Sequence, residues 1–421
     1  MVACSAGGHV RALGSVAALV LVAGSLLAGC GEGRSTHAVL NADAPTALAD
    51  RAVHISVSGL RGGERVSVAA SAPDVRGQVW RGDADFRADA HGTVDLVRDR
   101  STSGTYTGVD GMGEFWSMNP PGGGPVLDAF SPPTSSYSVT ISVTSHGHRL
   151  AERTLTRQWI GTGVTHKPLT LAADKVYGDL FLPPPGTPRH PAVMLISGSG
   201  GGEFPPEVAS LLASHGYPAM SLAYFGVPGL PPALQNIPLE YFTRAARLLA
   251  SQPGVDPAHL VALGNSRGSE AALLLGQRYP ALIHGVIVYV PSATVNVGYP
   301  SAKSRAWTDG GRPVPLGFIP VDHISGPVLA IAGSQDRLWP SETAAREITS
   351  GLDAVHDRFP HRALVYQGAG HGVDGVLYLP EGTTMRHPLT GAPTVLGGTR
   401  PATAAAQRQA WDQVLGLLAA L

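Results

Sequence analysis

Cysteine is nearly absent from this sequence, which has only two among its 421 residues, Cys4 and Cys30. Both lie within the first thirty residues, so no disulfide can form in the rest of the chain. If the protein is exported to an oxidising compartment, its fold must therefore be stabilised by its core alone.

An excess of charge of either sign is also missing. Charged residues make up 14% of the sequence, and the formal net charge is −1. Without a basic excess there is no electrostatic basis for binding nucleic acid, and we expect no such partner. The apolar content of 43% is typical of a globular chain and not of a disordered one.

The apolar run near the N-terminus, residues 16–27, is too short to span a bilayer comfortably. It ends in Leu27-Ala28-Gly29-Cys30, which resembles a bacterial lipobox. This pattern predicts a signal peptide over residues 1–30 and a diacylglyceryl group on Cys30. The mature protein would then be anchored to the outer face of the cell membrane as a lipoprotein. The alternative is an ordinary secretory signal and a secreted protein. The segment contains no twin arginine, so it favours the general secretory route.

The length exceeds what one compact core usually needs, so we expect two domains. Residues 31–50 are small and polar without a clear period, which predicts a flexible tether. Residues 51–162 contain short stretches in which apolar and polar residues alternate, separated by turn residues. This pattern predicts short strands packed as a small β-sandwich. Residues 53–57 and 65–69 are expected to pair as a hairpin around the turn between them.

Residues 170–421 alternate between apolar strands and helical segments. The run at 191–196 is continuously apolar, as expected of a strand buried on both faces. Further strands are expected at 177–182, 217–222, 260–263, 286–290 and 328–332. This alternation predicts a mostly parallel sheet flanked by helices.

One stretch carries a strong catalytic signal. Four apolar residues, 260–263, are followed by Gly264-Asn265-Ser266-Arg267-Gly268 and then by a helical run. This is the order of a nucleophile elbow, in which small residues permit a sharp turn and the serine hydroxyl is exposed. The motif alone also fits a glycine-serine turn, but the strand and the helix around it favour Ser266 as a nucleophile. Glu270 can pair with Arg267 across one helical turn.

A glycine-rich run, Ser197-Gly198-Ser199-Gly200-Gly201-Gly202, follows the apolar run at 191–196. It fits neither a phosphate-binding P-loop nor a dinucleotide fingerprint. It does fit the loop that lends a second oxyanion N–H group in α/β-hydrolases. We therefore expect an oxyanion hole formed by the backbone N–H groups of Ser199, or of a residue next to it, and of Arg267. This chemistry needs no cofactor and no metal ion.

A serine nucleophile needs a base and an acid that orients the base, and in this fold the acid precedes the histidine in the chain. Asp336 follows a predicted strand closely, and catalytic sites form at the carboxyl ends of parallel strands. His371 lies in a glycine-flanked loop after the next strand, where its ring is free to reach Ser266. Asp322 and Asp374 are alternatives for the acid.

The chain resembles the acyl-CoA thioesterase / bile acid-CoA:amino acid N-acyltransferase (BAAT) family from about residue 53 onward. The resemblance rests on stretches that follow one another in family order: residues 86–92, 111–113, 221–225, 237–242, 264–270 and 333–336, then Trp339, Ser341 and Glu342, and residues 370–372. It implies an immunoglobulin-like domain followed by an α/β-hydrolase domain.

In this family the nucleophile is Ser in the thioesterases and Cys in the amino-acid acyltransferases. Ser266 therefore implies hydrolysis of an acyl thioester to a free fatty acid and a thiol, with Asp336 and His371 at the other triad positions. The predicted export signal departs from the family's familiar intracellular members, since coenzyme A is a cytosolic compound. One alternative is thus an exported carboxylic-ester hydrolase or acyltransferase that acts on envelope lipids or exogenous acyl esters. A second is a non-catalytic surface binding lipoprotein.

Overall fold

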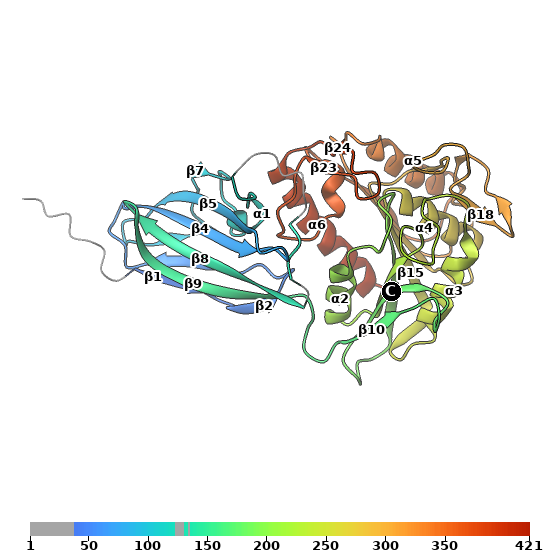
Figure 1. Ribbon diagram of the computed structural model, residues 1–421, viewed down its shortest axis with the longest axis horizontal. Coiled ribbons are helices and arrows are strands. Elements are labelled where there is room, and N and C mark those ends of the chain that lie inside the picture. The colour runs from blue at the N-terminus through green and yellow to red at the C-terminus, as the bar shows by residue number, and fades with distance from the viewer. Residues whose placement is uncertain (1–37, 123–129, 134) are drawn as a thin grey trace, which may run out of the picture. The chain divides into compact units, whose positions relative to one another are not determined.

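The computed structural model describes residues 38–122, 130–133 and 135–421, so the predicted signal peptide and Cys30 lie outside the described residues. The first part, blue to green in Figure 1, contains a six-stranded and a three-stranded sheet and the one-turn helix α1 (Gly113–Trp116). The larger sheet comprises β2 (Thr46–Leu48), β9 (His148–Gln158), β8 (Ser136–Ser145), β4 (Arg65–Pro73), β5 (Val79–Arg87) and β7 (Ser103–Gly104), in that order. The smaller comprises β1 (Val39–Ala42), β3 (Ile55–Ser58) and β6 (Val94–Asp95).

The predicted tether is wrong for residues 39–48, because this segment contains β1 and β2. They pair with β3 and β9, and Leu40 and Ala47 are buried. Both strands are short and lack a repeated alternation, so only their distant pairing partners define them.

The expected hairpin of residues 53–57 with 65–69 is also wrong. β3 pairs with β1 and β6, whereas β4 pairs with β5 and β8 in the other sheet. The connection therefore crosses between the two sheets, as sandwich connections commonly do. Alternation identifies a half-buried strand but not the sheet that it joins. The domain boundaries at 51–162 and 170–421 stay a prediction.

The second part contains an eight-stranded sheet (Figure 1). Its order is β10 (Thr165–Leu169), β11 (Tyr177–Leu182), β13 (Ala219–Ala223), β12 (His190–Ile196), β15 (Val255–Asn265), β16 (Gly285–Tyr289), β21 (Val328–Gly333) and β22 (His361–Tyr366). Neighbours from β13 to β22 are parallel, and β10 and β11 form an antiparallel edge. The mostly parallel sheet of the predicted α/β-hydrolase fold is thus confirmed.

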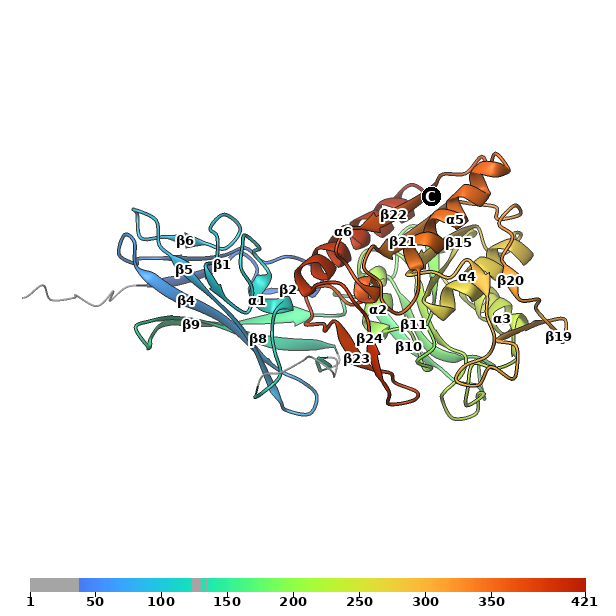
Figure 2. The ribbon, with the colours of Figure 1, turned by 90° about the horizontal axis from the view of Figure 1, so that it is seen from above.

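Helices cover both faces of this sheet (Figures 1 and 2). One face packs against α2 (Pro206–Ser214) and α6 (Arg400–Ala419), and the other against α3 (Leu239–Ala250), α4 (Arg267–Arg278) and α5 (Ser341–Ala354).

The strand β12 shows how the sequence produces this arrangement. Its neighbours Met194 and Leu195 are both fully buried, Leu195 in the core beneath α2 and α6 and Met194 in the core on the opposite face. Side chains alternate between the faces of a strand, so a continuously apolar strand serves two cores.

Short elements lie in the connections: β14 (Ile237–Pro238), β17 (Thr294–Val295), β18 (Trp307–Asp309), β19 (Arg312–Pro313), β20 (Gly317–Phe318), the 3₁₀ helix η1 (His371–Asp374), β23 (Thr384–Arg386) and β24 (Pro393–Val395). In the described part of the chain, no helix combines the length and the apolar character that a membrane span requires.

Candidate active site

Ser266 lies at the turn between β15 and α4, at the carboxyl end of a central strand. Its backbone has φ 51° and ψ −122°, a conformation that residues with a side chain rarely adopt. The Ser266 N–H group donates to the carbonyl of Tyr289 on the neighbouring strand at 2.9 Å, which holds the strained turn in place. This is the backbone expected of a nucleophile elbow.

Both glycines of the motif are required by close approach of the backbone. A Cβ atom at Gly264 would lie 2.3 Å from the carbonyl oxygen of Gly268. A Cβ atom at Gly268 would lie 2.4 Å from the carbonyl oxygens of Ile196 and Ser197. The missing side chains therefore let α4 pack against the end of β12 and the glycine-rich loop that follows it.

Arg267 is the first residue of α4, so its backbone N–H group has no acceptor within the helix. Its side chain forms the predicted ion pair with Glu270, with Nε 2.6 Å from Oε1. Glu270 is fully buried and also accepts hydrogen bonds from Trp307 at 2.8 Å and from Asn296. These donors compensate the buried charge and fix the N-terminal turn of α4.

Asp336 and His371 lie together at the carboxyl ends of β21 and β22. His371 Nδ1 is 2.8 Å from Asp336 Oδ2, and both side chains are almost inaccessible to solvent. The same carboxylate oxygen accepts from Ser341 Oγ at 2.6 Å, and Oδ1 accepts from the backbone N–H groups of Leu338 and Trp339. Four partners thus orient the carboxylate so that it can hold one tautomer of the His371 ring.

The His371 loop is held by contacts beyond Asp336. The His371 N–H group donates to the carbonyl of Leu396 at 2.9 Å, and the edge of the ring faces Trp339 with 5.9 Å between centroids. Ser266 and His371 are each 6% exposed, so both are largely screened from bulk water. Within the described residues, no hydrogen bond joins the Ser266 hydroxyl to His371. The structure therefore brings the acid and the histidine together, and contacts between base and nucleophile are often long before substrate binds.

The first alternative for the acid, Asp322, lies away from the histidine. It accepts a hydrogen bond from Gln277 Nε2 at 2.8 Å, and its carboxylate is 3.6 Å from His323. Its side chain is half exposed, so it fits a surface role.

The second alternative, Asp374, is partly buried close to the site. It accepts a hydrogen bond from Asn265, the residue before the nucleophile. Burial raises the pKa of the Asp374 carboxyl, while the nearby His371 and the bond from Asn265 act in the opposite direction. Its partner is thus Asn265, and the direct contact with the His371 ring belongs to Asp336.

Glu381 is a partly buried acid that the sequence did not reveal. Gln407 donates to its carboxylate and also to the carbonyl of Gly372, which links α6 to the His371 loop. Burial raises the pKa of Glu381 well above its usual value, and the nearby Asp374 raises it further. No local pattern marks Glu381, because only the fold places it beneath this loop.

The glycine-rich loop lies beside the nucleophile. A Cβ atom at Gly198 would be 3.0 Å from Ser266 Cβ and 3.5 Å from its Oγ. Ser199 Oγ is 3.1 Å from Nε2 of His387, a residue that the sequence did not single out. Burial lowers the pKa of His387, which favours its neutral form. The loop is thus positioned close to the carbonyl that Ser266 would attack.

A cavity of about 610 Å³ opens next to this loop. Leu379, Pro388 and Leu396 contribute to its apolar lining. A Cβ atom at Gly200 would lie 3.2 Å from the Pro388 ring, and the Leu396 carbonyl is the acceptor of the His371 N–H group. Two residues of the cavity wall thus contact the glycine-rich loop and the His371 backbone, although Ser266 and His371 do not themselves line the cavity. Its volume is large enough for a small-molecule group.

Candidate metal ligands do not gather here. Throughout the residues that the structure describes, no group of three or more His, Cys, Asp or Glu residues could hold a metal ion. Ser266, His371 and Asp336 are residue types that acyl-transfer chemistry uses.

Comparison with known proteins matches both parts of the chain. Residues 50–171 match the family described as acyl-CoA thioester hydrolase/BAAT N-terminal region, and residues 312–420 match BAAT / acyl-CoA thioester hydrolase C terminal. The chain is 30% identical to acyl-coenzyme A thioesterase 3 of Mus musculus, over 87% of this chain and 90% of that protein. It is 30% identical to acyl-coenzyme A thioesterase 1 of Homo sapiens, over 87% of this chain and 92% of that protein. A puromycin-hydrolysing peptidase of Mycobacterium tuberculosis matches with a TM-score of 0.44 and 16% identity, over 83% of this chain and 53% of that one.

Proposed function

Since the chain belongs to the acyl-CoA thioesterase/BAAT family, we propose that it is a serine thioester hydrolase that cleaves acyl thioesters to a free fatty acid and a thiol. Two observations carry the proposal: the buried Asp336–His371 pair, and Ser266 held in a strained elbow at the carboxyl end of a central strand. The relatives named acyl-coenzyme A thioesterases support the substrate class.

The proposed reaction begins at Ser266. His371 takes the proton of the hydroxyl group while the oxygen attacks the thioester carbonyl, and Asp336 stabilises the imidazolium that forms. The negative charge on the carbonyl oxygen is stabilised by the N–H groups of Ser199 and Arg267, each contributing on the order of 3 kcal/mol. His371 then protonates the departing thiolate as the C–S bond breaks, which leaves an ester on Ser266.

Water completes the proposed cycle. His371 removes a proton from a water molecule, the hydroxide attacks the ester on Ser266, and the free acid leaves as the serine hydroxyl is restored. An oxygen ester is less readily attacked by amines than a thioester of cysteine, so a serine nucleophile favours water as the acceptor. The cavity lined by Leu379, Pro388 and Leu396 is the proposed location of the acyl chain.

The alternative of an exported ester hydrolase or acyltransferase is favoured by one observation, the lipobox-like Leu27-Ala28-Gly29-Cys30. We propose that Cys30 is lipidated and anchors the protein at the outer face of the cell membrane. A single acyl chain binds membranes only marginally, so the anchor would need two or three chains. Detergent-phase partition of the native protein should be lost in Cys30→Ser, and a mass spectrum with unmodified Cys30 would contradict the anchor.

The experiment that tests the function combines labelling with a substrate panel. A fluorophosphonate should label Ser266, and no label should enter the Ser266→Ala protein. The labelled enzyme should lose its activity toward acyl-CoAs, with p-nitrophenyl esters as the comparison substrates. Turnover of the esters with no turnover of any acyl-CoA would favour the ester hydrolase. N-acyl product formed in excess of free acid at millimolar glycine would favour the acyltransferase.

A further inference from the structure

The tip of the glycine-rich loop, residues 199–201, is held by one hydrogen bond. Within the described residues, the only hydrogen bond that the tip makes joins Ser199 Oγ to Nε2 of His387 at 3.1 Å. The base of the loop is closed separately, since Ser197 Oγ donates to the carbonyl of Gly202 at 2.8 Å. Glycines flank Ser199 on both sides, so the backbone of the tip has little intrinsic stiffness. The orientation of Ser199 therefore depends on its side-chain bond to His387.

The backbone of Ser199 is suited to stabilise an oxyanion. In the part of the chain that the structure describes, its N–H group has no acceptor, as a donor reserved for a substrate oxygen requires. The loop also approaches the nucleophile closely, because a Cβ atom built on Gly198 would lie 3.0 Å from Ser266 Cβ. An oxyanion donor acts only if it points at the developing charge. A restraint on Ser199 thus bears on the rate.

His387 is itself fixed from several sides. Its N–H group donates to the carbonyl of Ala392 at 2.8 Å, and its own carbonyl accepts from the N–H group of Gly391 at 2.7 Å. Its ring packs against Tyr299 with 4.9 Å between centroids, and the residue is 8% exposed. Tyr299 in turn exchanges two backbone hydrogen bonds of 3.0 Å with Leu234. The imidazole is therefore a rigid partner for the loop.

The hairpin of β23 and β24 connects this partner to the catalytic histidine (Figure 2). His387 directly follows β23, and Leu396 directly follows β24. The Leu396 carbonyl accepts from the His371 N–H group at 2.9 Å, and the Leu396 N–H group donates to the carbonyl of Thr383 at 2.9 Å. One hairpin thus contacts both the glycine-rich loop and the His371 loop, so it can set the position of one relative to the other.

Ser199 and His387 do not form a second nucleophile and base. The other ring nitrogen, Nδ1, is buried without a hydrogen-bond partner among the described residues, so no acid orients this imidazole as Asp336 orients His371. His387 also does not line the cavity beside the loop. Its contact with the site is therefore made through Ser199.

We propose that His387 is a positioning residue for the hydrolysis: through its hydrogen bond to Ser199, it holds the glycine-rich loop so that the Ser199 N–H group points at the oxyanion. This inference rests on the proposed function in taking Ser266 as the nucleophile and Ser199 as an oxyanion donor. It does not require the substrate to be a thioester.

His387→Phe tests the role, because it keeps a ring beside Tyr299 and removes the nitrogen that contacts Ser199. With p-nitrophenyl octanoate as the substrate, kcat should fall about tenfold while KM changes by less than about twofold. This loss is smaller than the 10²–10³ on the order of which a whole oxyanion donor contributes. His387→Gln should stay within about threefold of the parent, because its amide can replace Nε2 in the bond to Ser199.

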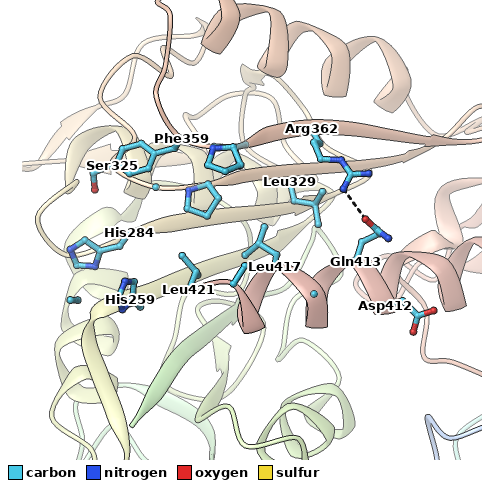
Figure 3. Close-up of a pocket in the computed structure, with 17 residues that line it drawn as sticks. His259, His284, Ser325, Leu329, Phe359, Arg362, Asp412, Gln413, Leu417 and Leu421 are labelled. Carbon is cyan, nitrogen blue, oxygen red and sulfur yellow. Dashed lines mark hydrogen bonds between the residues drawn. The ribbon is translucent and has the colours of Figure 1, made fainter.

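His284 offers a matched control at the opposite end of the strands from Ser266, where it lines a separate cavity (Figure 3). Like His387, it has an Nδ1 atom that is buried without a hydrogen-bond partner in the described chain, and burial lowers the pKa of both rings. His284→Phe therefore makes the same chemical change in a comparable environment. It should leave kcat unchanged.

A trifluoromethyl ketone inhibitor separates positioning from folding, because its oxygen takes the place of the oxyanion in the adduct with Ser266. Its Ki should rise about tenfold in His387→Phe and in Ser199→Ala, which keeps the N–H group and removes only the hydroxyl. The double variant should lose no more than either single variant, since both changes remove one bond. If circular dichroism shows that His387→Phe is unfolded, Ser199→Ala carries the test under the same criteria.

Unchanged kcat and Ki in His387→Phe, additive losses in the double variant, or a His387→Gln protein as slow as His387→Phe would overturn the role of His387. An equal loss in His284→Phe would also overturn it. A parent that hydrolyses the ester but no acyl-CoA would contradict the proposed substrate and leave the role of His387 measurable. A parent with neither ester turnover nor fluorophosphonate labelling would contradict both proposals.

Discussion

The side-chain amide of Asn265 donates a hydrogen bond to the partly buried carboxylate of Asp374, and this bond joins the loop that carries Ser266 to the loop that carries His371. Asn265 directly precedes Ser266, and Asp374 ends the 3₁₀ helix that begins at His371. The distance between Ser266 and His371 thus depends on a contact that includes neither of them.

Asn265→Ala should lower kcat about tenfold and change KM little, because the substrate pocket remains while the base loses its alignment with Ser266. The variant also leaves the partly buried Asp374 without its donor, which should destabilise the protein by about 1 kcal/mol. Steady-state kinetics and thermal melts measure the two effects separately. An unchanged kcat would show that the bond does not position the two loops.

Asp336→Asn should lower kcat by about 10⁴, since an amide can no longer hold the imidazole in the required tautomer. Ser341→Ala is the matched control, because it removes one donor to the same carboxylate and leaves the contact with His371. Its loss should be far smaller. Similar rates for the parent and Asp336→Asn would transfer the role of the acid to Asp374.

Gly268→Ala should destabilise the protein by about 3 kcal/mol or more, because the new Cβ atom would overlap two carbonyl oxygens. Gly416→Ala makes the same chemical change in open space within α6 and should stabilise the protein by about 1 kcal/mol. Melting temperatures should therefore move in opposite directions. A neutral Gly268→Ala would contradict the close packing of α4 against β12.

His215 gives stability a dependence on pH. Its Nε2 lies 2.6 Å from Asp50, whose carboxylate also accepts from Trp411, and this bond raises the pKa of His215 above 6.5 although burial opposes the shift. The folded-state pKa exceeds the unfolded one, so the contribution is complete below about pH 6.5 and is lost as pH rises through the folded-state pKa. The Tm of the parent should fall over that interval relative to the Tm of His215→Gln. Parallel curves for the two proteins would show that the pair does not couple folding to protonation.

The parts of the fold and site that the sequence predicted are those with a local pattern. The continuously apolar β12, the elbow around Ser266 and the glycine-flanked His371 are each defined by residues adjacent in the chain. The ion pair between Arg267 and Glu270 was likewise predicted from two residues close in the chain, and the structure contains it.

The features that the sequence missed depend on distant partners. Glu381 and His387 meet the site only through loops that the fold brings back to it. β1 and β2 are strands because β3 and β9 lie beside them, and their own residues carry no clear alternation. The false hairpin of residues 53–57 with 65–69 arose because alternation does not specify the sheet that a strand joins.

The release of thiol from a medium-chain acyl-CoA by the parent and by Ser266→Ala tests most directly whether Ser266 is the nucleophile. Ser266 is only 6% exposed, but within the described residues its hydroxyl group makes no hydrogen bond, so the variant should fold, which circular dichroism verifies. Ser266→Ala should lose about 10⁶ in rate. Activity of Ser266→Ala within tenfold of the parent would contradict the assignment of Ser266 as the nucleophile.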